Sequence, residues 1–335
     1  MIKRLGSLIL AMAVSLLLVS LFLWINGYPP ARVFAALVTS TWGSTTGLFL
    51  LGTKTALLIL TGLAVAVPFR AGLFNIGGEG QLYLGALAAA ALGAQPWNAL
   101  GPLHGVLCMT AGCLCGALWG GIAAGLKSRR GIHEVITTIM LNFIAFQVVN
   151  EMTLGVLNAG PGSSRTAMVA ESARFPLLYA RGAAQLTAGI VLSVILAAGL
   201  SWMLHRTWFG FHLRAVGGNP TAAAYAGIAV PRIQWQAMLW GGGCAGLAGA
   251  LQVTSIDYTL YTRFGGGYGF DGIAVAFLGL CEPWATIPAA LIIATLRAGD
   301  RTLQLDLNVP REMVFILEGL LIIGIALFTR MRSHE

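Results

Sequence analysis

Apolar runs of membrane-spanning length recur along almost the whole sequence. A helix needs about 20 residues to cross the hydrocarbon core of a bilayer, which is about 30 Å thick. Only 10% of the residues are charged, against about 25% in ordinary soluble domains. A soluble protein of 335 residues needs a charged surface that this chain lacks. The sequence therefore predicts an all-α integral membrane protein whose apolar surface faces lipid.

The apolar runs predict about ten transmembrane helices in a single membrane domain, residues 1–335. The eighth and ninth runs are short and interrupted by Gly or Pro, so the count could lie between about eight and eleven. The first run could be a signal peptide, but it is longer than the apolar part of such a peptide and lacks a small-residue cleavage site. We therefore expect it to remain as a membrane helix. The runs cover residues 8–25, 47–67, 71–94, 102–126, 134–156, 186–204, 233–253, 272–281 with its flanks, 283–299 and 312–329.

Two further segments are expected outside the bilayer. Residues 28–45 contain Pro29, Pro30 and an amphipathic stretch, which is typical of a helix on the membrane surface. Residues 157–185 form a polar loop that contains Pro161 and several arginines.

The basic residues predict the orientation in the membrane. An even number of helices places both termini on one side, and the short loop 127–130 has the basic sequence Lys-Ser-Arg-Arg. Short basic loops stay in the cytoplasm, which makes both termini cytoplasmic. Eleven basic residues then face the cytoplasm and eight, Arg297 among them, lie outside. The remaining one, Lys54, lies within the second run and would either snorkel or line the interior.

A glycine-rich break, RAGLFNIGGEGQ at residues 70–81, interrupts the third run. Its polar side chains are Asn75, Glu79 and Gln81. Glu79 would lie roughly 13 Å beyond Arg70 along a helix, close to the bilayer midplane. A charge or irregular backbone at that depth is tolerated where it faces protein or a water-filled pathway. The segment therefore either lines a translocation pathway or ties helices together by hydrogen bonds.

The polar residues of this break cannot all share one face of a regular helix. Helical spacing places Asn75 and Glu79 on one face and turns Gln81 away from Glu79 by about 160°. Unwinding at glycines 77, 78 and 80 could aim all three at one cavity. Glu79 would then stay protonated, pair with a cation such as Lys54, or accept hydrogen bonds from the broken backbone.

A second glycine-rich break, GGGYGFDGIAVA at residues 265–276, carries Asp271. It would enter the membrane from the side opposite to the first break. Paired breaks of this kind indicate an inverted repeat, here residues 47–156 and 233–329, with the transport pathway between the two halves. Asp271 is therefore a candidate pathway residue, and the alternative is helix capping at the membrane surface.

A third polar position lies in the run that begins with HEVITTIMLN at residues 133–142. Glu134 and Asn142 are two helical turns apart and share one face. Asn142 would lie near the middle of the membrane. It could contact a transported solute or form hydrogen bonds to a neighbouring helix.

A short helix with little charge is predicted between the sixth and seventh runs, within residues 206–232. Asn219 is a good N-cap and Pro220 suits the first turn, while Gly227 ends the helix. A plain connector is more often polar. The small residues favour a helix that docks in the groove of a partner protein.

Four strings together resemble a known family, the permeases of bacterial ATP-binding-cassette importers for ribose-type sugars, branched-chain amino acids and nucleosides. The nucleoside branch is the most similar. The likeness covers residues 47–329, and the strings occur in the family's order. They are GLFNIGGEGQ (72–81), HEVITTIMLN (133–142), RAVGGNPTAAAYAGI (214–228) and GYGFDGIAVAFLG (267–279).

The resemblance implies a multi-pass permease of the bacterial plasma membrane, embedded in lipid and without a cofactor. It implies a second, non-identical permease, two cytoplasmic ATPase subunits, and an external solute-binding protein. The implied substrate is a small polar solute, with nucleosides first, simple sugars second and a vitamin third. Related sequences often carry an acid where Gly218 stands. The ATPase-coupling residues that the resemblance implies are Val216, Gly217, Gly218, Asn219, Pro220, Ala222, Ala223, Tyr225, Ala226 and Gly227.

Other functional classes fit the sequence less well. The chain has no phosphate-binding loop, so we expect no ATP hydrolysis by the chain itself. An ion-coupled secondary transporter would use Glu79 or Asp271 for protons and need no partner. A membrane enzyme is disfavoured because no metal-ligand spacing and no Ser-His or Cys-His pairing is evident. The basic residues are scattered at the ends of apolar runs, which argues against nucleic acid.

Overall fold

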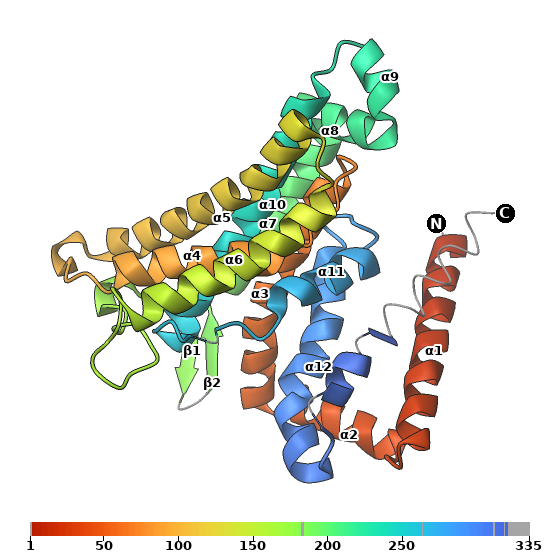
Figure 1. Cartoon of the computed structure of the whole chain (residues 1–335). Helices are drawn as coiled ribbons and strands as arrows, with labels where there is room; N and C mark the ends of the chain where they lie inside the picture. The colour runs from red at the N-terminus through yellow and green to blue at the C-terminus, as the bar shows by residue number, and fades with distance from the viewer. Residues whose placement is uncertain (1, 182–183, 263, 311, 318, 321–335) are drawn as a thin grey trace.

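The computed structural model is a bundle of helices (Figure 1) and describes residues 2–181, 184–262, 264–310, 312–317 and 319–320. Each predicted run up to residue 299 overlaps one helix. The last predicted run, 312–329, lies largely outside the described residues. The helices are α1 (Ile2–Ile25), α2 (Pro30–Thr41), α3 (Thr45–Phe69), α4 (Gly78–Gly93), α5 (Pro102–Arg130), α6 (Glu134–Leu154), α7 (Gly189–Arg206), α8 (Trp208–Gly218), α9 (Pro220–Tyr225), α10 (Val230–Gln252), α11 (Tyr268–Leu278) and α12 (Thr286–Leu307).

Four of the described helices, α3, α5, α6 and α7, are long and apolar enough to cross a membrane on their own. The bent pair α1 and α2 would add a fifth span. The predicted count of about ten is therefore not confirmed. Helices α4 and α11 have only 16 and 11 residues. Helices α10 and α12 are long enough but not apolar enough, and the last predicted run lies largely outside the described residues.

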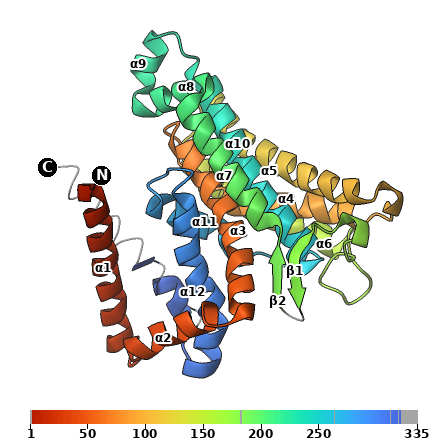
Figure 2. The same ribbon diagram turned by 180° about the vertical axis from the view of Figure 1, so that it is seen from behind.

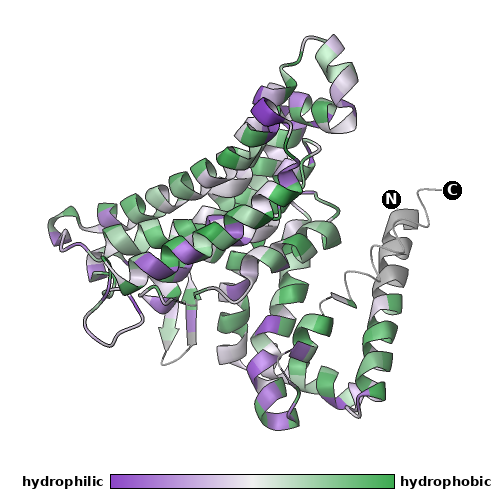
Figure 3. Cartoon of the chain, viewed as in Figure 1, coloured by the Kyte–Doolittle hydropathy of each residue, from purple (hydrophilic) through white to green (hydrophobic). Residues whose placement is uncertain are grey.

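Large apolar side chains cover much of the outer surface, as expected for a protein in lipid. Leu17, Phe143 and Ile195 are each more than half exposed. In Figure 3, hydrophobic residues dominate the sides of α5 and of the described part of α1, while hydrophilic residues gather where α8 lies. This pattern supports the multi-pass membrane protein that the composition predicts.

The two segments expected outside the bilayer have defined structures. The amphipathic stretch forms α2, which turns by 115° from α1 and buries Val33 and Leu37 in a core shared with α12. The polar loop is more ordered than predicted. It ends in an antiparallel hairpin of β1 (Leu177–Arg181) and β2 (Ala184–Thr187), seen from behind in Figure 2. This short hairpin is a minor element in a chain that is otherwise helical, which is consistent with the predicted all-α membrane protein.

Hydrogen bonds to α3 and to the π-helical turn Val253–Asp257 that follows α10 explain why the hairpin is ordered. The Thr53 hydroxyl donates to the carbonyl oxygen of Gln185 at 2.8 Å and accepts from the amide of Thr187 at 3.3 Å. The Thr187 hydroxyl donates to Ser255 Oγ at 3.1 Å. Threonines inside apolar runs give no sign in the sequence of which backbone they bind.

Helix α3 is the centre of the bundle and packs against α7, α10, α11 and α12. Helix α10 packs against α4 and α5 through glycines. A Cβ at Gly246 would lie 2.2 Å from the carbonyl oxygen of Gly112. Such contacts explain why glycine is frequent in these helices, because it allows their backbones to approach. Each short helix packs on a long helix from the other half of the sequence. Helix α4 packs on α10, and helix α11 packs on α3.

Candidate functional site

The first glycine-rich break is a buried turn held by one asparagine. Asn75 Nδ2 donates to the carbonyl oxygen of Ala64 at 3.0 Å, and Asn75 Oδ1 accepts from the amide of Gly77 at 3.0 Å. The amides of Asn75 and Gln81 also bond each other reciprocally, at 3.0 and 3.1 Å. Asn75 precedes α4 and is not helical, so of the two alternatives the structure shows the unwound segment and not the regular helix in which Asn75 shares a face with Glu79. Asn75 meets Gln81 instead.

Glu79 lies in the first turn of α4 and binds the backbone of the second break. Its Oε2 accepts a hydrogen bond of 2.6 Å from the amide of Gly269, and the side chain is only 3% exposed. A Cβ at Gly269 would lie 2.2 Å from the Glu79 amide nitrogen, so the starts of α4 and α11 touch backbone to backbone. Of the three states predicted for Glu79, bonding to broken backbone is the one observed.

Lys54 lies partly buried in α3 and forms a hydrogen bond to α12. Its Nζ donates to the carbonyl oxygen of Arg297 at 2.9 Å. The chain thereby brings two cations from α3 and α12 to the same region of the bundle interior.

Asp271 lies in the first turn of α11 and forms a buried ion pair. Its Oδ1 accepts from Arg297 Nη2 at 2.6 Å, and the two side chains are 7% and 6% exposed. The N-cap position belongs to Gly267, whose φ of 82° suits glycine, so Asp271 does not occupy the cap.

Arg297 is the functional candidate that the sequence reasoning missed. It was expected in an outer loop, but α12 extends past it and buries it beside the rings of Tyr268 and Phe315. The sequence held a usable signal. An acid in one intramembrane run and an arginine in the next are each costly alone, which indicates a pair.

Asn142 joins α6 to the first break. Its Nδ2 donates to the carbonyl oxygen of Ile76 at 2.9 Å, and its Oδ1 accepts from the amide of Gly80 at 2.9 Å. Glu134, on the same face as predicted, accepts from Lys127 Nζ at 2.6 Å. Of the two predicted roles for Asn142, hydrogen bonding to a neighbouring segment is the one that the structure displays.

The five predicted pathway residues therefore surround one junction, where the starts of α4 and α11 meet between α3, α6 and α12. All five are buried. None of them lines the groove between α5 and α10 or the cavity beside Arg70 and Arg214. Tyr83 covers the junction together with Phe146 and Phe264, at ring distances of 4.6 and 5.6 Å. The geometry is that of a closed, hydrogen-bonded contact between two half-helices.

The predicted coupling helix is present as α9, at the end of the bundle where α8 also lies (Figure 1). Asn219 Oδ1 accepts from the amide of Ala222 at 3.0 Å, Pro220 begins the helix, and Gly227 has a φ of 82°. These features confirm the cap, the first turn and the stop that the sequence predicts.

Burial divides the ten predicted coupling residues into two groups. Val216 and Ala223 are buried in the core, and a Cβ at Gly217 would lie 2.1 Å from the carbonyl oxygen of Arg70. Val216 and Ala223 anchor the segment to the core and cannot offer a side chain to a partner, while Gly217 is exposed and also packs against the backbone that follows α3. The exposed group contains Gly217, Gly218, Asn219, Pro220, Ala222, Tyr225, Ala226 and Gly227.

A pair of adjacent glycines tests this anchoring. Gly217→Ala should lower the free energy of unfolding by about 1–3 kcal/mol, because the new methyl group overpacks against the end of α3. Gly218→Ala should leave stability unchanged or raise it by up to about 1 kcal/mol, since nothing lies within 4 Å of its Cβ. Thermal unfolding of the two purified variants in detergent measures both. Equal midpoints would contradict the close contact at Gly217.

One Ser-His contact forms in space that the sequence did not reveal. His104 Nδ1 lies 2.9 Å from Ser172 Oγ, while His104 Nε2 lies 3.0 Å from the carbonyl oxygen of Leu92. The Ser172 hydroxyl donates to Asn98 at 3.1 Å. Since a main-chain oxygen holds the second ring nitrogen in place of an acid, the contact fastens a loop and does not form a triad. The described residues also contain no group of three or more His, Cys, Asp or Glu that could hold a metal ion.

Comparisons with known proteins agree with the geometry of a transport subunit. The family model described as "branched-chain amino acid transport system / permease component" matches residues 48–326. A guanosine ABC transporter permease of Bacillus subtilis is 35% identical, over 97% of this chain and 95% of its own length. A glucose ABC transporter permease of Haloferax volcanii is 32% identical, over 88% and 80%. A nucleoside ABC transporter permease of Lactococcus lactis is 29% identical, over 95% and 89%.

Proposed function

The chain belongs to the permease component family of branched-chain amino acid transport systems, and from this premise we propose that it imports a nucleoside as part of an ATP-binding-cassette transporter. The observation that carries the substrate proposal is the 35% identity to a guanosine permease over almost the full length of both chains. A nucleoside permease at 29% identity supports it. A glucose permease at 32% identity favours a sugar as the second candidate.

The family implies that energy comes from other subunits. We propose two cytoplasmic ATPase subunits, a second and non-identical permease, and an external solute-binding protein. The exposed residues of α8 and α9 would receive the ATPase, so that end of the bundle would face the cytoplasm, and we propose that both termini face the same side. ATP binding would then act on the membrane part through rigid-body movement of the docked segment.

The junction of α4 and α11 is proposed as the closed section of the pathway. Half-helices that meet near the midplane are a common design for solute sites in transporters. The exchange of packing partners between α4–α10 and α11–α3 supports the inverted repeat of residues 47–156 and 233–329. Glu79 and Asp271 each begin one half-helix, so separation of the halves would expose both carboxylates together with Asn75, Gln81 and Asn142.

Uptake of labelled guanosine tests the proposed function. The chain is co-expressed with its partner permease, ATPase subunits and binding protein in cells that lack other nucleoside uptake. We expect saturable guanosine uptake that other nucleosides inhibit and glucose does not, and that stops when the ATPase subunits carry an inactive phosphate-binding loop. Glucose uptake alone would favour the sugar candidate. Uptake by the chain without ATPase subunits, abolished when the proton gradient collapses, would establish the ion-coupled alternative.

A further inference from the structure

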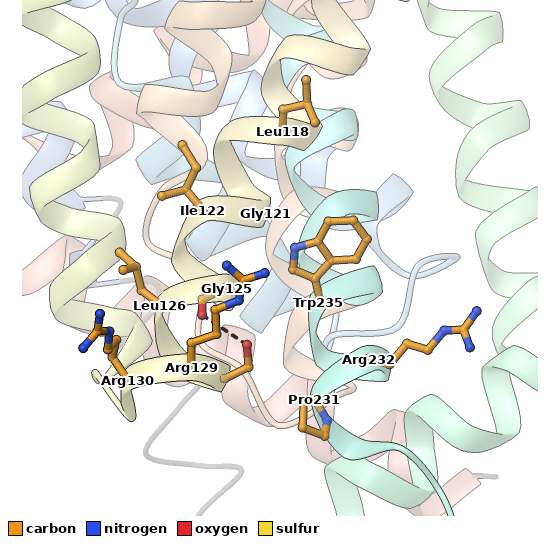
Figure 4. Close-up of a pocket in the computed structure, with 11 residues that line it drawn as sticks. Leu118, Gly121, Ile122, Gly125, Leu126, Arg129, Arg130, Pro231, Arg232 and Trp235 are labelled. Atoms are coloured by element: carbon orange, nitrogen blue, oxygen red, sulfur yellow. Dashed lines mark hydrogen bonds between the residues drawn. The ribbon is translucent and has the colours of Figure 1, made fainter.

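An open groove of about 710 Å³ lies between the end of α5 and the start of α10, away from the junction. Figure 4 shows it as a slot between the two helices, with Trp235 on one wall and the arginines at its mouth. Its lining residues are Leu118, Gly121, Ile122, Gly125, Leu126, Ser128, Arg129, Arg130, Pro231, Arg232 and Trp235.

The inner part of the groove is apolar and kept open by glycine. Leu118, Ile122 and Trp235 are 65%, 42% and 41% exposed. A Cβ at Gly121 would lie 3.4 Å from Trp235 Nε1, and one at Gly125 would meet nothing within 4 Å. A larger side chain at Gly125 would therefore project into the slot. The apolar walls suit a hydrocarbon chain or a ring, not a charged group.

The mouth of the groove is strongly basic. Arg129, Arg130 and Arg232 are exposed, and the ion pairs of the described residues include none of the three. Neighbouring Lys127 differs, because Glu134 neutralises it. In Figure 4 the Arg129 side chain lies between the two helices, while Arg130 and Arg232 extend on either side. The mouth therefore suits an anion that the chain itself does not supply.

We propose that this groove binds an anionic phospholipid. Its phosphate lies among the three arginines, the headgroup boundary lies beside Trp235, and one acyl chain follows Leu118 and Ile122. Arginine clusters beside membrane helices recognise anionic headgroups, and tryptophan favours the boundary between headgroups and hydrocarbon. The groove is basic at its mouth and apolar further in, and a phospholipid likewise has a charged headgroup followed by an apolar acyl chain.

The length of the groove decides between a lipid and a soluble partner. Leu118 lies about 18 Å along the helix from Arg130, at 1.5 Å per residue, which reaches well into the hydrocarbon layer. A cytoplasmic ATPase subunit cannot occupy that depth, while an acyl chain does. A second permease could cover the apolar wall, but would have to bring acids of its own to neutralise the mouth.

Lipid retention by the purified full-length chain tests the proposal. Native mass spectrometry would follow bound phosphatidylglycerol, with phosphatidylcholine of identical acyl chains as the comparison. We expect the wild type to retain phosphatidylglycerol selectively, and Arg129→Gln/Arg232→Gln to bind it about tenfold or more weakly. Gly125→Leu should also lose the lipid, because it fills the slot without changing charge.

Matched variants keep the test specific. Arg206→Gln removes an exposed arginine at the end of α7, and Gly199→Leu adds the same side chain to an open position of α7; both should retain the lipid. Equal retention of both lipids by the wild type, or unchanged binding in the two groove variants, would overturn the proposal. Displacement by millimolar inorganic phosphate alone would identify a soluble-anion site. Loss of permease association in Gly125→Leu with lipid binding intact would identify a protein interface.

Discussion

Arg297→Met is expected to lower the free energy of unfolding by about 3–5 kcal/mol, because it breaks the buried ion pair between Arg297 and the carboxylate of Asp271. Arg297 Nη2 lies 2.6 Å from Asp271 Oδ1, and both side chains are at least nine-tenths buried. Methionine keeps most of the apolar stem that packs on Phe315 and Tyr268. The loss therefore reports the broken charge pair and not a cavity. Thermal unfolding in detergent, followed by tryptophan fluorescence, measures it.

The double variant Asp271→Asn/Arg297→Met separates the structural part of this effect from a role in transport. Replacing both members of a buried pair by neutral groups is often nearly neutral for stability, so the double variant should recover most of the loss. If the pair belongs to the pathway, the double variant should import less solute per folded molecule than the wild type even though its stability is recovered. Recovery of stability and of uptake together would assign the pair to folding alone. A single variant as stable as the wild type would refute the buried pair.

The features that the sequence predicts correctly are those that depend on residues close by in the chain. The cap at Asn219, the stop at Gly227 and the breaks at the two glycine-rich segments depend on neighbouring residues, and all are where the sequence predicts. The helices of the apolar runs follow from hydropathy for the same reason. What the sequence cannot supply is the number of spans, because short half-helices such as α4 and α11 do not have spanning length.

The features that escaped prediction all depend on distant parts of the chain. The count of basic residues assigned Arg297 to the outer side of the membrane, but Asp271, which lies 26 residues away in the sequence, forms a buried ion pair with it. The sequence left open whether Asn75 is helical or unwound, and its bonds to Ala64 and Gln81 hold it in a turn. The close approach of Gly217 to the carbonyl oxygen of Arg70 is likewise not visible in the sequence. In each case a tertiary contact decides the role of a residue type that the sequence had correctly identified as unusual.

Ala224→Arg should abolish co-purification of the ATPase subunits while leaving the folded permease intact. Ala224 is exposed on α9, next to Tyr225, which is 91% exposed. An arginine on a close-packed docking surface adds bulk and a charge that the partner does not pair, and a loss of 1.4 kcal/mol already weakens binding about tenfold. Ala223→Arg is not suitable for this purpose, because Ala223 is buried and an arginine there would disturb the fold.

The controls distinguish docking from a plain connector. Ala159→Arg places the same side chain at an exposed position of the loop that follows α6, at the other end of the bundle, and should retain the ATPase. Tyr225→Ala, which removes an exposed ring without adding charge, should weaken association less than Ala224→Arg. Both α9 variants should keep the wild-type unfolding temperature, since neither position belongs to the core. If Ala224→Arg retains the ATPase and normal uptake, α9 only connects α8 to α10 and the coupling surface lies elsewhere.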